Sequence, residues 1–386
     1  MALAARLGLA LLYEPPPPSG DAADFARHAA AIADEGGYPP SPVALEGGAS
    51  AFRPPGYPYV LAAVYELSGR GDSPRAFGAL LGTLAVALLG VVALRLFGRR
   101  TALVAMAIAA VFPPLVMVSV AQLAEGLFIV LVLGALAAVL SGPDRLRWVL
   151  AAGALAGAAA LTRSNGIVIL LPLVLAATGG RRRVALLAAA AVVIAPWSIR
   201  NTTQLDGFVP LTTQAGFAFA GAYNDEARTD DEHPAAWRIP AMQPYIGLRR
   251  PGLDEAEIER AFLEQAVDYA REHPAYPLTV LWWSSARMLN VADFQRNAGS
   301  AREAGVGRRY THLNRYAFWA LALLALAGAL TAAARAAPRW LWLFPVLLWL
   351  SVAVAIGTTR YRTPVDPFLI LLAAAALVRP PRPARR

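Results

Sequence analysis

Residues 76–97 read AFGALLGTLAVALLGVVALRLF, an apolar run whose one charged residue is Arg95 near its end. A helix needs about 20 mainly apolar residues to cross the hydrocarbon core of a bilayer, so this run predicts a membrane-spanning helix. Similar runs recur along the chain, and a soluble core could not bury all of them. The predicted fold class is therefore an all-α polytopic membrane protein.

Nine membrane spans are predicted from these apolar runs. They lie at about 76–97, 101–119, 122–140, 146–162, 164–178, 184–199, 314–334, 339–357 and 364–378. The opening run from Ala2 to Tyr13 would reach only about 18 Å as a helix, which is too short to cross. We interpret residues 1–13 as a truncated first transmembrane helix, or as a segment that dips into the interface, and expect about nine to ten transmembrane helices.

Composition excludes several other classes of protein. Of the 386 residues 57% are hydrophobic and only 16% are charged, against about 25% charged in ordinary soluble domains. The absence of cysteine excludes disulfides and thiolate metal sites. The net charge of +9 comes from arginine without any lysine. These arginines cluster beside the apolar runs, so we attribute them to membrane topology and expect no nucleic-acid partner.

Arginine positions predict the orientation in the membrane. The short connections on one side hold Arg95, Arg99, Arg100, Arg145, Arg147, Arg181, Arg182, Arg183, Arg335 and Arg339, followed by the tail from Arg379 to Arg386. They alternate with the other connections, and the positive-inside rule makes their side cytoplasmic. We expect a multi-pass protein of the plasma (inner) membrane with its active site facing outside.

The domain organisation follows from this orientation. It comprises a first extracytoplasmic loop with interfacial helices at 14–75, a transmembrane helix bundle at 76–199, an extracytoplasmic loop or small subdomain at 200–312, C-terminal transmembrane helices at 313–378 and a basic cytoplasmic tail at 379–386. Outside the spans, helices are predicted from Asp21 to Glu35, from Pro54 to Leu67, and from Leu253 to His273. The last has apolar residues at helical spacing.

Ionisable residues gather at the outer ends of the spans, against the positive-inside trend. They are Asp21, Arg53, Glu125, Arg163, Arg200, Arg360 and Arg362. Arginines at a bilayer surface suit a phosphate group, and a carboxylate can serve as a general base toward a hydroxyl. Fixed cations also stabilise a leaving phosphate. This set predicts sugar transfer from a lipid-phosphate carrier at the outer leaflet.

Six short stretches carry a resemblance to a known family. They are Gly20-Asp21-Ala22-Ala23-Asp24-Phe25, Phe52-Arg53-Pro54-Pro55-Gly56-Tyr57-Pro58, Ala124-Glu125-Gly126-Leu127-Phe128, Leu161-Thr162-Arg163, Pro196-Trp197-Ser198-Ile199-Arg200-Asn201 and Arg360-Tyr361-Arg362-Thr363-Pro364. In this order and topology the chain resembles the C-class (GT-C) integral membrane glycosyltransferases, the group of protein mannosyltransferases and aminoarabinose transferases, and bacterial members above all.

The resemblance implies an activity and a set of site residues. It implies inverting transfer of a sugar, hexosyl or pentosyl, from a polyprenyl-phosphate-linked donor to an extracytoplasmic protein, lipid or cell-envelope glycan. The implied catalytic residues are Asp21 as the base, Asp24 as its nearby alternative and Glu125 as a second acid. The implied phosphate-binding residues are Arg53, Arg163, Arg200, Arg360 and Arg362, and the implied cavity residues are Tyr57, Asn201 and Tyr361.

Other readings of these residues stay open. Asp21 is also a favoured residue at a helix start, Glu125 could pair with an arginine only to hold helices together, and arginines at helix ends can snorkel to the headgroups. No certain cofactor is implied. Some relatives use a divalent metal, whereas the four histidines are scattered and form no metal set. The alternative functions are a transporter or flippase of a lipid-linked or anionic substrate and a non-catalytic assembly partner.

Overall fold

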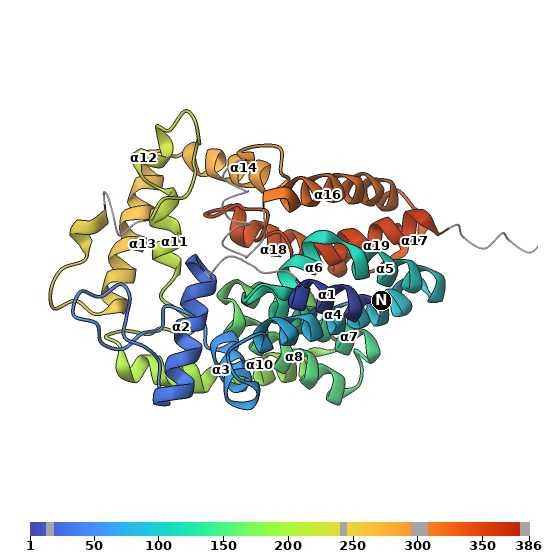
Figure 1. Cartoon of the computed structure of the whole chain (residues 1–386), viewed down its shortest axis with the longest axis horizontal. Helices are drawn as coiled ribbons and strands as arrows, with labels where there is room; N and C mark the ends of the chain where they lie inside the picture. The colour runs from blue at the N-terminus through green and yellow to red at the C-terminus, as the bar shows by residue number, and fades with distance from the viewer. Residues whose placement is uncertain (13–18, 240–244, 295–307, 379–386) are drawn as a thin grey trace, which may run out of the picture.

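A computed structural model describes residues 1–12, 19–239, 245–294 and 308–378. Within these residues the chain is helical and contains no strand. Figure 1 shows α11, α12 and α13 at one end of the molecule, and α5, α17 and α19 at the other. The predicted all-α architecture is confirmed. The predicted basic tail at 379–386 and Tyr13 lie outside the described residues.

Apolar helices form the larger part of the fold. The first set is α4 (Ser73–Phe97), α5 (Arg99–Val111), α6 (Pro113–Val120), α7 (Glu125–Ser141), α8 (Leu146–Thr162), η1 (Ser164–Ile169), α9 (Leu170–Ala176) and α10 (Gly180–Gln204). The second set is α16 (Arg308–Ala329), α17 (Ala332–Ala336), η3 (Arg339–Trp342), α18 (Leu343–Ala353) and α19 (Asp366–Leu377). A helix therefore stands at each of the nine predicted spans.

Two of these helices, α4 and α10, are each long and apolar enough to cross a membrane. The pair α5 and α6 meets the same test together, although the two helices are bent by 58°. The prediction of one unbroken helix at 101–119 was wrong because Pro113 cannot donate the hydrogen bond that a continuous helix needs. Apolar helices of 10–17 residues, such as α7, α8 and α19, complete the set. The number of crossings stays a prediction.

The predicted amphipathic helices also form. They are α2 (Gly20–Glu35), α3 (Gly56–Ser68) and α13 (Glu255–Glu272), joined by α11 (Ala215–Ala222), α12 (Asp225–Arg228), η2 (Tyr245–Leu248) and α14 (Tyr276–Met288). Helix α13 begins with a capping box between Asp254 and Glu257, which satisfies N–H groups at the helix start. Its face of Ile258, Phe262 and Ala266 is buried, as its periodicity predicts.

One buried carboxylate, Glu255 in α13, joins the two polar segments of the chain. It accepts hydrogen bonds from Ser41 Oγ at 2.5 Å, Ser50 Oγ at 2.9 Å and the Ala51 N–H at 2.7 Å. Thr213 Oγ1 donates a fourth at 2.5 Å. Because a buried carboxylate needs such donors, the first polar loop is fixed against α13, and this contact holds the loop that carries Arg53 in place.

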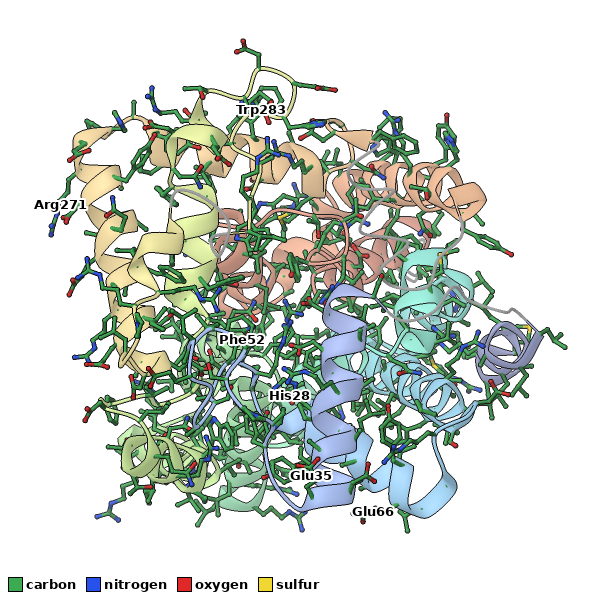
Figure 2. All side chains as sticks on the ribbon, turned by 60° about the vertical axis from the view of Figure 1, so that its left-hand side comes forward. His28, Glu35, Phe52, Glu66, Arg271 and Trp283 are labelled. Atoms are coloured by element: carbon green, nitrogen blue, oxygen red, sulfur yellow. The ribbon has the colours of Figure 1, made fainter. Side chains whose placement is uncertain are left out.

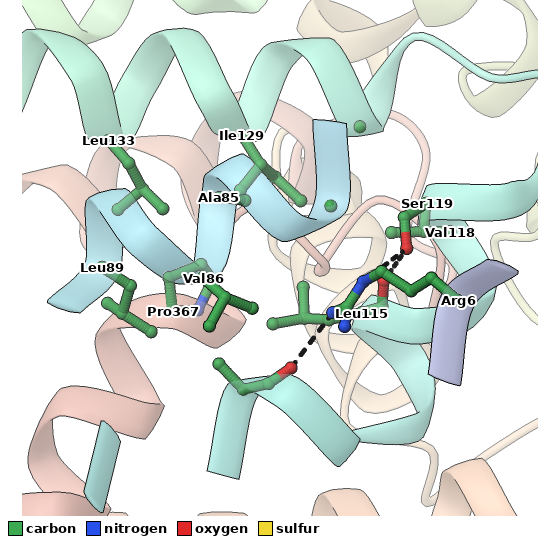
Figure 3. A pocket seen from close by; sticks show the side chains of 13 residues that line it. Arg6, Ala85, Val86, Leu89, Leu115, Val118, Ser119, Ile129, Leu133 and Pro367 are labelled. Carbon is green, nitrogen blue, oxygen red and sulfur yellow. Dashed lines mark hydrogen bonds between the residues drawn. The ribbon is translucent and has the colours of Figure 1, made fainter. Parts of the chain in front are cut away.

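A buried arginine fastens the opening helix, α1 (Ala2–Leu12), to the break between α5 and α6. Arg6 is 1% exposed. Its guanidinium donates to the carbonyl oxygens of Ala109 at 3.1 Å and Ala110 at 3.0 Å, and to Ser119 Oγ at 3.1 Å. Figure 3 shows this side chain reaching from α1 across a small apolar cavity. The carbonyl groups freed where α5 ends thus gain a donor.

We predict that Arg6→Leu lowers the free energy of unfolding by about 2 kcal/mol or more, because each buried carbonyl left without a donor costs about 1–3 kcal/mol. Thermal unfolding in detergent measures the change. Arg271→Leu is the control, since Arg271 is 75% exposed in its pair with Asp268 and points outward from α13 (Figure 2). Equal melting temperatures for the two variants would contradict the role given to Arg6.

Candidate active site

A cavity of about 1040 Å³ lies where the ends of several helices meet. Its lining comes from the start of α2, the loop before α3, the end of α8, the start of α11, α14, and the segment between α18 and α19. Asp21, Arg53, Arg163, Arg360 and Tyr361 contribute to that lining. The structure therefore brings together predicted site residues that are more than 300 positions apart in the chain.

Arg360 connects the two acids that the sequence singles out. Its Nη2 donates to Asp21 Oδ2 at 2.6 Å and its Nε donates to Glu125 Oε1 at 2.6 Å. Arg163 Nη1 donates to the same Glu125 oxygen at 2.7 Å. Both arginines also lie over the ring of Tyr361, with guanidinium carbons 4.9 and 5.0 Å from the ring centre. Glu125, which is fully buried, holds two cations side by side.

Arg53 extends this ion-pair network to the second acid of α2. Its Nη2 donates to Asp21 at 2.6 Å and its Nε donates to Asp24 at 2.5 Å. The guanidinium lies over the rings of Phe25 at 5.0 Å and Phe52 at 5.4 Å. In formal charge these three arginines balance three carboxylates. Burial makes each pair important, because removing one partner leaves an uncompensated charge.

The arginines set the protonation of Asp21. Burial by itself would raise the pKa of this carboxyl, but the charges of Arg360 and Arg53 outweigh burial and lower the pKa below its ordinary value. Asp21 is therefore ionised in this arrangement and is a weak proton acceptor. Its position in the first turn of α2 adds to the stabilisation of its negative charge.

Five predicted residues lie away from the cavity lining. Arg200 donates to the Ser50 carbonyl at 2.6 Å and lies over Trp197. Arg362 donates to Asp366 at 2.9 Å and to the Met288 carbonyl at 2.6 Å.

The other three of these residues are buried or ion-paired behind the cavity wall. Tyr57 packs edge-on against Phe25 with ring centres 5.2 Å apart. Asn201 donates to the Val209 carbonyl, and Asp24 is held by Arg53 and Arg27. Each of the five has a neighbour that supports a positioning role.

The cavity also has an aromatic wall that the sequence did not indicate. Phe52 meets Phe217 of α11 with ring centres 5.2 Å apart, and Phe217 lies 5.6 Å from Trp237. All three line the cavity. Phe52 lies near α2 in the middle of Figure 2. The signal available in the sequence was the position of Phe52 next to Arg53, whereas Phe217 and Trp237 stand in a long insertion without a clear period.

The carboxylates of the site do not form a metal-ligand set. Among the residues that the structure describes, no group of three or more histidines and acids is placed to hold a metal ion. Asp21, Asp24 and Glu125 are each held by arginine instead, and a cation would have to displace these guanidinium groups. We therefore assign no step of the chemistry to a metal.

Comparisons with known proteins agree with this fold. Residues 52–200 match the family model for dolichyl-phosphate-mannose-protein mannosyltransferase. An oligosaccharyltransferase of Archaeoglobus fulgidus, solved with a tethered acceptor peptide, is 16% identical with a TM-score of 0.56. That match covers 97% of this chain and 48% of the other. The same enzyme with an inhibitory peptide and a dolichol-phosphate gives 15% identity, a TM-score of 0.56 and coverages of 97% and 49%.

The ArnT protein of Cupriavidus metallidurans is 17% identical, with a TM-score of 0.42 and coverages of 97% and 76%. The search of curated proteins gives no match. The chain spans about half the length of the archaeal enzyme. The matched segment and the shared fold place this integral membrane protein among the relatives of the C-class (GT-C) glycosyltransferases. The resemblance predicted from the sequence is confirmed.

Glu259 of α13 generates a pH prediction, because it holds the start of α11, where the aromatic wall begins. Its Oε1 accepts the Gly216 N–H at 2.8 Å. Burial raises the pKa of Glu259 from 4.5 to about 7, against the lowering effect of the N–H groups of α11. The folded state thus keeps the proton to about pH 7, while the unfolded state loses it near pH 4.5. Stability should decrease as pH rises between these two values.

We expect Glu259→Gln to remove most of this decrease, which is about 3 kcal/mol for a shift of this size. Chemical denaturation at pH 5 and pH 8 measures it. Glu264→Gln, on the exposed face of the same helix, should retain the wild-type pH dependence. A wild-type stability that rises from pH 5 to pH 8 while that of Glu259→Gln stays flat would contradict the assignment.

Proposed function

We propose that the protein is a membrane glycosyltransferase that moves a sugar from a polyprenyl-phosphate-linked donor to an extracytoplasmic acceptor with inversion. The observation that carries this proposal is the junction of Arg360 with Asp21 and Glu125 at the wall of a large cavity. The family-model match over 52–200 favours this activity over the transporter that the sequence left open. We place the protein in the plasma (inner) membrane with this cavity facing outside, following the arginine asymmetry.

The reaction needs one base and one site for a leaving phosphate. Asp21 takes the proton of the acceptor hydroxyl as its oxygen attacks the anomeric carbon from the face opposite the phosphate. The bond from the anomeric carbon to the phosphate oxygen breaks, and its electron pair stays on the lipid phosphate. Arg360 and Arg163 stabilise the charge that develops there. Attack from the opposite face gives inversion.

The ion pairs of the cavity explain how one aspartate could be both quiet and reactive. Without donor, Arg360 and Arg53 keep the pKa of Asp21 low. A donor phosphate that accepts hydrogen bonds from Arg360 would draw this guanidinium away from Asp21. The pKa of Asp21 would then rise toward its ordinary value, and its strength as a base would rise with it. Glu125 keeps Arg360 and Arg163 together throughout, which is a positioning role.

The lipid-linked donor and the acceptor are supported in general terms by the relatives. One structure of the archaeal oligosaccharyltransferase holds a dolichol-phosphate and another a tethered acceptor peptide. A further structure of that enzyme holds zinc and sulfate. For this chain we propose only the lipid-phosphate donor and an acceptor with a free hydroxyl or amide. The aromatic wall of Phe52, Phe217 and Trp237 is the surface that we assign to the acceptor.

Asp21→Asn should lower sugar transfer by roughly 100-fold or more, because positioned general bases contribute about 10²–10⁴ in rate. Transfer from radiolabelled polyprenyl-phosphate sugars in membranes, at matched expression, measures it. Asp34→Asn is the matched control, since Asp34 lies on the same helix with its side chain 56% exposed. Full transfer by Asp21→Asn would move the base to another residue.

Arg360→Lys should weaken the binding of sugar-free polyprenyl phosphate by about tenfold, because lysine keeps the charge but loses the fork that contacts carboxylates and phosphate together. A binding titration in detergent measures this without any turnover. Arg70→Lys, in the exposed pair with Asp34, should bind like wild type. Unchanged affinity in Arg360→Lys would remove Arg360 from the phosphate site.

A further inference from the structure

Two buried hydroxyl groups in the cavity have no hydrogen-bond partner. They are Ser284 Oγ, from α14, and Thr358 Oγ1, from the segment before α19. Ser284 is 1% exposed, and both residues line the cavity. A buried hydroxyl without a partner is costly, so two of them on one cavity wall point to a ligand that supplies hydrogen bonds there.

Close packing fixes these hydroxyls beside the arginine that we assign to the phosphate. Gly357 lies directly on the backbone of Ser284, and a Cβ atom at 357 would overlap it. Thr358 stands two positions before Arg360. Arg362 Nη1 donates to the Met288 carbonyl at the end of α14 at 2.6 Å. Helix α14 and the segment with Arg360 therefore form one wall of the cavity.

An amide and a further hydroxyl complete this neutral polar patch. Asn165 Nδ2 donates to Ser351 Oγ at 3.0 Å, and both residues line the same cavity. Asn165 stands two positions after Arg163, just as Thr358 stands two positions before Arg360. Each phosphate arginine thus has a neutral hydrogen-bonding residue as a near neighbour in the chain.

The charge of the cavity opposes a cationic ligand. Among its described lining residues the acid is Asp21, which is held by two arginines. Five arginines line the cavity, namely Arg53, Arg163, Arg238, Arg287 and Arg360. An ammonium group would be repelled here, since no free carboxylate in this lining could balance it.

We propose that Ser284, Thr358, Asn165 and Ser351 form the subsite for the sugar ring of the donor, and that this sugar is neutral. The proposal rests on the proposed function for the phosphate and its arginines. Hydroxyls of the ring give Ser284 and Thr358 the partners that they lack. An amino sugar is excluded by the arginines, and a uronic acid is disfavoured because its carboxylate would compete with the lipid phosphate for the same cations.

The test uses purified full-length protein and four donors: polyprenyl phosphates that carry a neutral hexose, a neutral pentose, an amino sugar or a uronic acid. We expect kcat/KM at least about tenfold higher for one of the neutral sugars than for either charged sugar. Ser284→Ala and Thr358→Val should each lower kcat/KM for that neutral donor by about tenfold. Both should leave the affinity for sugar-free polyprenyl phosphate unchanged.

Ser285→Ala and Thr359→Val are matched controls, because these neighbours lie outside the cavity lining and should behave like wild type. A charged sugar preferred by wild type would overturn the proposal, as would unchanged kcat/KM in both subsite variants.

Binding gives a second readout that does not require transfer. Wild type should bind the neutral-sugar donor more tightly than sugar-free polyprenyl phosphate, and Ser284→Ala and Thr358→Val should lose this difference. Loss of the difference in the variants, with no transfer from any donor, would contradict the proposed function while supporting the subsite. Equal binding of all ligands by wild type and variants would overturn the subsite, whatever the activity.

Discussion

The contact on which the site depends is the guanidinium of Arg360 between Asp21 and Glu125. It joins the start of α2, the start of α7 and the segment before α19. A guanidinium presents its donors in a rigid fork, so it can hold two carboxylates at a fixed spacing. Because Glu125 is fully buried, it requires this partner, and a lysine in its place could not meet both acids in the same way.

That requirement explains the design around the cavity. The balanced charges let six ionisable groups share a small volume, and Tyr361 and Phe25 cover their apolar sides. The fold outside the membrane supports the same point, because Glu255 fastens the loop before Arg53 to α13. An incoming phosphate meets cations that are already aligned, and binding it redistributes existing ion pairs instead of creating a charged site from nothing. Such preorganisation is what electrostatic stabilisation of a leaving group needs.

The two walls of the cavity differ in chemistry, which divides the work between the two substrates. Phe52, Phe217 and Trp237 offer apolar faces, while α14 and the segment near Thr358 offer hydroxyls. The arginines lie between these walls and Asp21. A donor held by phosphate and ring hydroxyls would leave the aromatic side open to the acceptor. This arrangement brings the acceptor hydroxyl to the aspartate and the phosphate to the arginines.

Local chemistry made much of this protein predictable. Apolar length placed the nine predicted spans, the period of Ile258, Phe262 and Ala266 marked α13, and ionisable groups at outer span ends marked Asp21, Arg163 and Arg360, because all of these are properties of neighbouring residues. Three things depended on the tertiary structure: the break at Pro113, the pairing of Arg360 with acids 339 and 235 positions away, and the cavity walls from Phe217 to Ser284. Arg200 and Arg362 show why, since a charge at a helix end reads alike whether it faces a cavity or a buried carbonyl. Only the packing of distant segments decides which groups a side chain meets.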